Sequence, residues 1–214
     1  MRVCDRVKCE TFRYLDVRHQ SFGVPGAEED TAAVVVILVS EAVPADPADG
    51  YEAPGDPLFA RTTVEAFRDA GFEVSSMTDI RRMGVHATTA VKCAKTGYAI
   101  DPGTIRSCSE LLERELACFP QVRSVLLMGD VAIRAVNEIA RRSGERRAVR
   151  AGATYRIRGQ EHHFRGVRVF PSYLQAGPSF YIEKQRRRMI AEDSAAGMRH
   201  AGLPPSGVRS TVTG

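Results

Sequence analysis

The chain has 214 residues, a hydrophobic fraction of 43% and a charged fraction of 26%, which fit one soluble α/β domain with a sizeable core. The longest apolar run, residues 33–39, is far shorter than the roughly 20 residues that a membrane-spanning helix needs. The polar N-terminus, with its cysteines, does not look like a signal peptide, so we expect a cytosolic protein. The net charge of +4 permits a polyanionic partner without requiring one.

The patterns along the chain predict strands that alternate with helices. The β-branched run at 33–40 predicts a strand buried on both faces, and the proline-rich segment 41–57 predicts a long loop after it. The remaining expected elements are a helix at 59–71, a strand at 88–93, a helix from 101, a strand at 124–129, a helix from 130, strands within 154–173 and a helix at 181–191. The tail from about 195 is expected to fray.

This alternation predicts a three-layer α/β/α sandwich around a mostly parallel, four-stranded sheet, with one domain at 1–194 and a flexible tail at 195–214. In such sheets ligands bind at the carboxyl ends of the strands. We therefore expect the loop after Ser40, the segment around Thr89 and the turn at 171–175 to share one rim.

Several stretches, in order, resemble the uracil-DNA glycosylase superfamily, in particular its iron–sulfur, family-four-like branch. The segments that carry this resemblance are VVVILVSEAVP, Pro57–Leu58–Phe59, TTAVKC followed by Cys108, LLMGDVAIRAV and YRIRGQEHHFRGVRVFPSYLQ. They extend over nearly the whole expected domain. The resemblance implies hydrolysis of the N-glycosidic bond of a deaminated or damaged base in DNA, with single- or double-stranded DNA as the partner, no membrane association and a monomeric protein.

The resemblance also implies a [4Fe–4S] cluster on Cys4, Cys9, Cys93 and Cys108, because thiolates are the ligands that such clusters prefer. Four residues separate Cys4 from Cys9, where the family has two, and fourteen separate Cys93 from Cys108. Zinc on the same thiolates and ordinary buried cysteines are the alternatives. Cys118, between apolar residues, is expected in the core.

In the resemblance, Glu41 holds the acidic position of the family's pocket loop, next to Ser40, and Phe59 supplies the surface on which a flipped base stacks. A carboxylate at this place orients water or stabilises positive charge on the sugar. Phe59 is alternatively a core residue at a helix start. Five acidic side chains between 41 and 56 also predict an acidic rim that repels phosphates.

Two pocket positions depart from the family. Thr89 stands where the family has an asparagine that reads the base edge, and a hydroxyl reads that edge less completely than an amide. Leu174 stands where the family has a histidine that stabilises the leaving base, a loss worth about 10²–10³ in rate. Gln175 replaces that donor only if the turn shifts, and is otherwise a surface residue.

Three functions follow from these observations: a divergent glycosylase with altered base recognition, a non-catalytic iron–sulfur protein that binds nucleic acid or a partner, and a hydrolase or transferase acting on a small nucleoside or glycoside. His86 is expected to be structural, His162 and His163 to lie in an exposed loop, and the arginines at 186–188 to form either a solvated or a phosphate-contacting surface.

Overall fold

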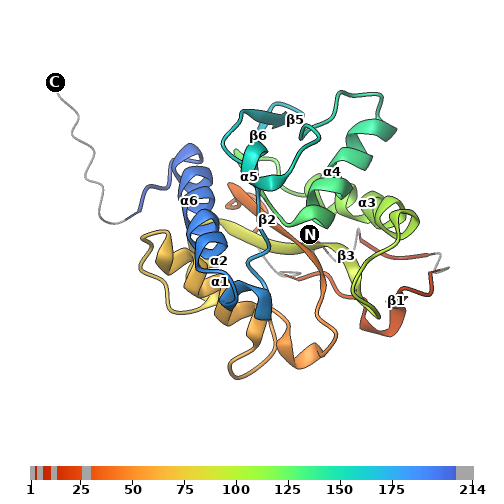
Figure 1. Cartoon of the computed structure of the whole chain (residues 1–214), viewed down its shortest axis with the longest axis horizontal. Coiled ribbons are helices and arrows are strands. Elements are labelled where there is room, and N and C mark those ends of the chain that lie inside the picture. The colour runs from red at the N-terminus through yellow and green to blue at the C-terminus, as the bar shows by residue number, and fades with distance from the viewer. Residues whose placement is uncertain (1–2, 4–6, 11–13, 26–29, 206–214) are drawn as a thin grey trace.

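The computed structural model describes residues 3, 7–10, 14–25 and 30–205. Figure 1 shows a central sheet between two layers of helices, with the C-terminal helix at the outer edge of one layer. The strands are β1 (Val17–Arg18), β2 (Val36–Val43), β3 (Val85–Lys95), β4 (Ser124–Met128), β5 (His162–Phe164) and β6 (Val167–Ser172). The helices are η2 (His19–Ser21), η3 (Pro47–Asp49), α1 (Leu58–Asp69), α2 (Met77–Arg82), α3 (Pro102–Leu116), α4 (Asp130–Arg142), α5 (Thr154–Ile157), η4 (Pro178–Tyr181) and α6 (Lys184–His200).

The predicted parallel sheet is present and forms the middle of a larger, mixed one. The strand order is β1-β3-β2-β4-β6-β5, and the four central strands β3, β2, β4 and β6 run parallel. The short strands β1 and β5 add antiparallel edges. The three-layer α/β/α fold expected from the sequence is therefore confirmed, with six strands where four were expected.

Two apolar cores cover the two faces of the sheet. Helices α3 and α4 pack on one face through residues such as Leu112 and Val136, and helices α1, α2 and α6 pack on the other through residues such as Phe67 and Ile190. Strands β2 and β4 are buried almost throughout, as expected of Val/Ile/Leu-rich strands covered on both sides.

Strand β3 contains a bulge where its pairing with β2 shifts. Ala42 pairs with Val91, but the next residue of β2, Val43, pairs with Ala94. Lys92 and Cys93 are therefore extra residues that leave the ladder, and a bulge of this kind re-aims the side chains it contains. The strand itself runs well beyond the expected 88–93.

Three local expectations were wrong. Residues 154–157 form the short helix α5 and not a strand. His162, expected in an exposed loop, is buried in β5, where its Nε2 lies 2.9 Å from the carbonyl oxygen of Ile157, while His163 is exposed. Helix α6 continues to His200 with Met198 fully buried, so residues 195–200 belong to the packed helix and not to a frayed tail. The helices of the described residues include none with the length and apolar composition to span a bilayer.

Candidate functional site

The carboxyl end of β2 places two neighbouring side chains on opposite faces of the sheet, because consecutive strand residues alternate. Ser40 points toward the layer of α1 and α6, and Glu41 points toward the start of α4. Each of them lies at the centre of a different cluster.

Glu41 lies against the turn between β4 and α4. Gly129, in a left-handed conformation with φ +101°, allows this close approach, because a Cβ there would stand 2.8 Å from the Glu41 Oε1 atom. Burial raises the pKa of Glu41, and the nearby Lys95 ammonium, 3.8 Å from Oε2, together with the Val131 N–H, opposes that rise. The carboxyl is one-fifth exposed, so it combines a shifted pKa with access to solvent.

On the other face, Ser40 belongs to a chain of buried hydrogen bonds. Its Oγ lies 2.8 Å from the phenol oxygen of Tyr51, and the Gln175 Nε2 donates to the same phenol at 2.9 Å and to the Thr63 hydroxyl at 3.2 Å. Burial raises the pKa of Tyr51, so the phenol stays protonated. Tyr51 comes from the long loop after β2, and its side chain fills this end of the sheet.

Two buried polar atoms of this cluster have no hydrogen-bond partner. Thr89 pairs with Ser40 in the sheet register, and its Oγ1 is unpartnered, as is the Oε1 atom of Gln175. In the described part of the chain only one other buried side-chain oxygen or nitrogen, the Ser194 hydroxyl, shares this property. Unpartnered buried polar atoms are rare and costly in folded proteins, so these two mark this end of the sheet as a candidate site.

The structure brings Ser40, Thr89 and Gln175 together with Phe59, whose ring meets Tyr51 edge-on at 5.7 Å between centroids. Gln175 is therefore inside the molecule and not on the surface. Leu174 packs half-buried against the core of the α1 and α6 layer. Glu41 does not join this group directly, since it lies on the other face of β2.

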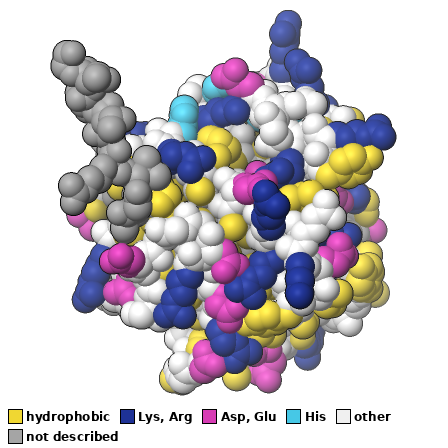
Figure 2. Space-filling view, turned by 60° about the vertical axis from the view of Figure 1, so that its left-hand side comes forward, with side chains coloured by type: hydrophobic (Ala, Val, Ile, Leu, Met, Phe, Trp, Pro, Cys, Tyr) yellow, Lys and Arg dark blue, Asp and Glu magenta, His cyan; other side chains and the backbone are white. Residues whose placement is uncertain are grey.

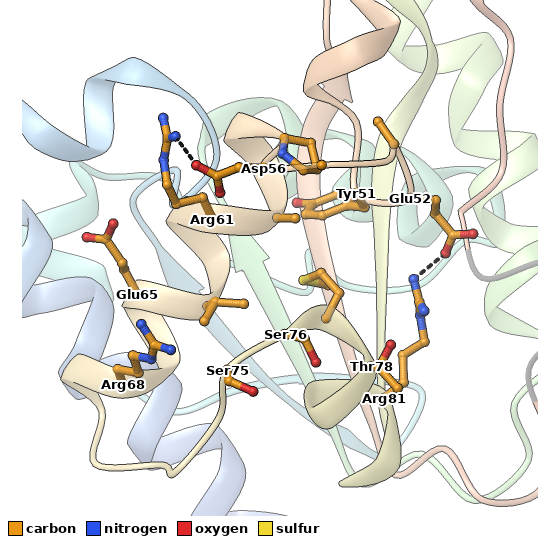
Figure 3. A pocket seen from close by; sticks show the side chains of 16 residues that line it. Tyr51, Glu52, Asp56, Arg61, Glu65, Arg68, Ser75, Ser76, Thr78 and Arg81 are labelled. Atoms are coloured by element: carbon orange, nitrogen blue, oxygen red, sulfur yellow. Dashed lines mark hydrogen bonds and ion pairs between the residues drawn. The ribbon is translucent and has the colours of Figure 1, made fainter.

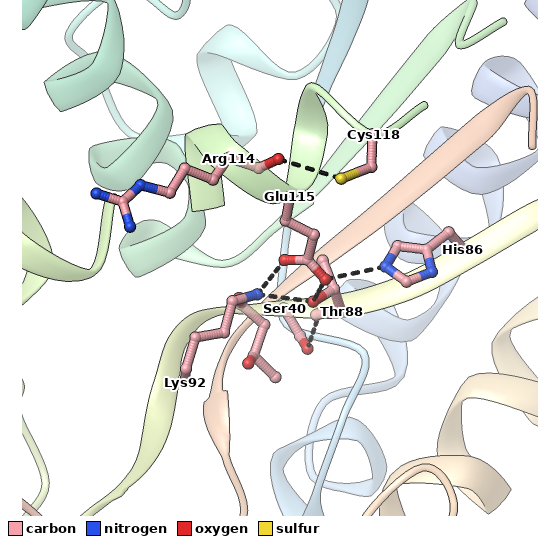
Figure 4. A network of polar contacts seen from close by, with 8 residues as sticks. Ser40, His86, Thr88, Lys92, Arg114, Glu115 and Cys118 are labelled. Atoms are coloured by element: carbon pink, nitrogen blue, oxygen red, sulfur yellow. Dashed lines mark hydrogen bonds and ion pairs between the residues drawn. The ribbon is translucent and has the colours of Figure 1, made fainter. Parts of the chain in front are cut away.

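A second buried polar network lies on the α3 side of the sheet (Figure 4). Glu115 of α3 bonds to Lys92, to the Thr88 hydroxyl at 2.8 Å and to the His86 Nε2 at 3.0 Å, and both the Lys92 and the Glu115 side chains are fully buried. Burial opposes ionisation of Glu115, but Lys92 and His86 together lower its pKa to about 2. His86 is thus structural, as predicted. Cys118, two residues after the end of α3, is buried with its thiol 3.4 Å from the Arg114 carbonyl oxygen.

Three of the four predicted cluster ligands line one cavity of about 250 Å³. They are Cys9, Cys93 and Cys108, and Cys4 lies outside the described residues. Burial, with the neighbouring Cys108 and Cys9 thiols, raises the pKa of Cys93 to about 12. No three His, Cys, Asp or Glu side chains of residues 3, 7–10, 14–25 and 30–205 are arranged to hold a single metal ion. Three thiols around one shared space nevertheless suit the donor set of an iron–sulfur cluster.

A larger open groove of about 610 Å³ lies between the loop 51–57, α1 and α2 (Figure 3). Its charged side chains pair with one another: Arg61 bonds to Asp56 and Arg81 bonds to Glu52, each at 2.5 Å. Asp46 instead caps the short helix η3. The predicted acidic rim is therefore largely neutralised. Glu41, Thr89 and Phe59 do not line this groove.

The arginines at the start of α6 are engaged in ion pairs. Arg187 bonds to Asp69 and Glu65, and Arg188 bonds to Glu192. Figure 2 shows basic and acidic side chains interspersed on the face that it displays. This arrangement fits the solvated-surface interpretation better than a phosphate-contacting one.

Sequence reasoning missed two features of these sites. Tyr51 belongs to the long loop after β2, and no local pattern fixes the side of the sheet to which a loop residue returns. The Lys92–Glu115 pair left a clearer signal, because a lysine inside an otherwise apolar strand needs a buried partner.

No family model matches the chain. The chain is similar to the type-5 uracil-DNA glycosylase of Thermus thermophilus, with 30% identity over 125 residues. The match covers 58% of this chain and 54% of the relative, so the chain spans about half the length of the curated relative that it matches. This similarity confirms the resemblance to the uracil-DNA glycosylase superfamily that the sequence motifs predicted.

Proposed function

We propose that this protein is a divergent DNA N-glycosylase that hydrolyses the bond between the sugar and a deaminated or damaged base in cytosolic base excision repair. The observation that carries this proposal is Glu41, a partly exposed carboxyl with a raised pKa at the carboxyl end of a central strand. The similarity to a type-5 uracil-DNA glycosylase supports the same reaction class.

In this proposal the Glu41 carboxylate stabilises positive charge on the sugar or orients the attacking water. The base enters beside Phe59, where aromatic stacking holds it. The unpartnered Thr89 hydroxyl donates to a carbonyl of the base, and the unpartnered Gln175 Oε1 accepts from a ring N–H. Since Leu174 offers no hydrogen bond to the leaving base, excision is slow compared with a site that has such a donor.

The proposed cofactor is a [4Fe–4S] cluster held by Cys4, Cys9, Cys93 and Cys108. Three of these thiols share the 250 Å³ cavity between the N-terminal segment, β3 and α3. When bound, the cluster supplies four iron–thiolate bonds that tie these segments together, which is a structural role. The chain's own residues carry out the base recognition and the bond cleavage.

One observation favours a second function, that of a non-catalytic iron–sulfur protein that binds nucleic acid or a partner. Tyr51 fills the cluster around Ser40 and Gln175, and these side chains are buried. Excision therefore requires the loop that carries Tyr51 to move aside, whereas binding at the surface does not. A small nucleoside remains the third candidate substrate, without the support of an acidic rim.

The test uses protein purified without oxygen and with its iron content measured. Single- and double-stranded oligonucleotides carry one uracil, hypoxanthine, xanthine or alkylated base, and alkaline cleavage reveals abasic sites. We expect excision by the wild-type protein, a loss of about 10²–10⁴ in Glu41→Gln, and no loss in the matched variant Glu52→Gln. Absence of abasic product from iron-loaded protein would reject the glycosylase and leave the binding protein, to be measured as oligonucleotide affinity.

A further inference from the structure

Lys92 lies between the two sites described above. Three residues before it in β3 is Thr89, with its unpartnered hydroxyl, and the next residue is Cys93, which lines the cysteine cavity. The bulge in β3 contains both Lys92 and Cys93. A residue in a bulge does not pair in the hydrogen-bond ladder, so its main chain and its side chain can form hydrogen bonds with different neighbours.

The Lys92 side chain is fully buried and uses all three of its ammonium hydrogens. It donates to the Thr88 hydroxyl at 2.8 Å, to the Thr89 carbonyl oxygen at 2.6 Å and to the Glu115 carboxylate. An ammonium has three donors, so this group is completely satisfied. The bond to the Thr89 carbonyl oxygen fixes the main chain of Thr89, the residue whose side chain faces the proposed base site.

The Lys92 main chain lies next to the cysteine cavity. Its carbonyl oxygen accepts from the Gly23 N–H at 2.9 Å, and the next residue, Cys93, lines the cavity together with Cys9 and Cys108. Cys93 therefore has a direct covalent connection to Lys92 within the bulge. A change in the position of the Cys93 sulfur is transmitted to the Lys92 backbone.

A buried ion pair is a poor device for stability alone, because a well-packed apolar pair of similar volume often does as well or better. Apolar residues at both positions would leave the Thr88 hydroxyl and the His86 Nε2 without the bonds that Lys92 and Glu115 make to them. What an apolar pair lacks is a directed bond to the Thr89 carbonyl. The geometry thus favours positioning over stabilisation as the role of Lys92.

We propose that Lys92 is a positioning residue that couples occupancy of the cysteine cavity to the placement of Thr89 at the base site. This proposal rests on the proposed function, because its effect on excision requires a glycosylase. It also requires a cluster bound by the four cysteines, because binding of that cluster is the event that Lys92 transmits. Filling the cavity fixes the Lys92 main chain, and the Lys92 ammonium then holds the Thr89 peptide in register.

The test compares two double variants that each neutralise a Lys/Arg–Glu pair involving α3. Lys92→Met/Glu115→Gln removes the charges of the buried pair but keeps a polar partner for His86 and Thr88. Arg142→Met/Glu113→Gln makes the matched change in a partly exposed pair. For iron-loaded and iron-free samples of each, the measurements are iron and sulfide per chain, visible absorbance and hydrogen exchange of residues 86–91.

In the wild-type protein and the matched variant, iron loading is expected to slow exchange at residues 88–91 by about tenfold or more, since exchange reports the free energy of local opening. Lys92→Met/Glu115→Gln is expected to take up iron but to lose this slowing, and its KM for an excised oligonucleotide rises more than its kcat falls. If that variant does not fold, Thr88→Val, which removes one of the three acceptors, is expected to show a reduced slowing.

Equal slowing in the wild-type and Lys92→Met/Glu115→Gln proteins would overturn the coupling, as would a wild-type chain that takes up no iron. Hydrogen exchange needs no substrate, so the coupling can be upheld even where no base is excised. A different result is that iron loading no longer slows exchange in Lys92→Met/Glu115→Gln although this variant excises bases as fast as the wild-type protein. That result would support the glycosylase activity and show that excision does not depend on Lys92.

Discussion

Two buried polar clusters lie on opposite sides of the same strands, and they differ in how completely their hydrogen bonds are satisfied. Around Glu115, the ammonium of Lys92, the Thr88 hydroxyl and the His86 ring all find partners. Around Tyr51, the Thr89 hydroxyl and the Gln175 Oε1 do not. A fully satisfied network makes a core rigid and specific, whereas unpartnered buried atoms call for an explanation, which the proposed base site supplies.

The largest expected effect comes from breaking the satisfied cluster. Glu115→Ala leaves the Lys92 ammonium buried without a counter-charge, so we expect a loss of about 3–5 kcal/mol in the free energy of unfolding. Chemical denaturation followed by circular dichroism measures it. Glu113→Ala, in a partly exposed pair of the same helix, should cost no more than about 1 kcal/mol, and an equal cost would mean that burial does not distinguish the two pairs.

The pH dependence of stability should separate Glu115 from Glu41. The pKa of Glu115 is lowered from 4.5 to about 2, so its stabilisation is complete above pH 4.5 and is lost as the pH falls toward 2. The pKa of Glu41 is raised, so its ionisation destabilises the folded state as the pH rises through its folded pKa. Denaturation midpoints measured from pH 2 to 8 should show less acid sensitivity in Glu115→Gln and higher stability at neutral pH in Glu41→Gln.

A smaller effect should separate two neighbouring threonines. Thr89→Val removes an unpartnered hydroxyl, so we expect a stability change within about 1 kcal/mol but up to about a tenfold loss of excision. Thr88→Val removes a hydroxyl that both Lys92 and Glu115 use, and should cost about 1–3 kcal/mol. If Thr89→Val were the more destabilising change, its hydroxyl would have a structural role.

The smallest effect is expected at the groove on the outer side of the loop. Glu52→Gln removes an ion pair with Arg81 whose two side chains are 50% and 29% exposed, so the cost should lie below about 1 kcal/mol. Thermal unfolding and the excision assay together measure it. A loss of excision in this variant would indicate that the groove takes part in the reaction, and it would count against a site at the strand ends.

The sequence predicted the scaffold better than the site, for physical reasons. Runs such as residues 33–40 and 124–128 are apolar without interruption, and only strands covered on both faces satisfy such runs. The short helix α5 was misread because four residues cannot display helical periodicity. The edge strand β1, of two residues, carries no pattern at all.

The site residues could be predicted only where their positions follow directly from neighbouring residues in the sequence. Ser40 was expected at the end of a strand and Glu41 at the start of the loop, whereas both lie in the second half of β2, which continues to Val43. Their separation onto two faces follows from alternation, but the Tyr51 hydroxyl bond to Ser40 depends on how an irregular loop folds back. Of the four cysteines predicted as cluster ligands, the three that the structure describes, Cys9, Cys93 and Cys108, line one cavity, while the cluster itself stays a proposal.

Tyr51 has a consequence for any affinity measured on this protein. Its phenol is a ligand that the chain supplies to itself, bonded to Ser40 and Gln175 and never diluted away. An incoming molecule that needs the same two groups competes with this internal ligand, and its apparent dissociation constant is its intrinsic constant divided by the fraction of molecules in which the loop is open. A high apparent dissociation constant would then reflect the small fraction of molecules with an open loop as well as the intrinsic affinity of the pocket. Measuring the dissociation constant of Tyr51→Phe would separate the two contributions.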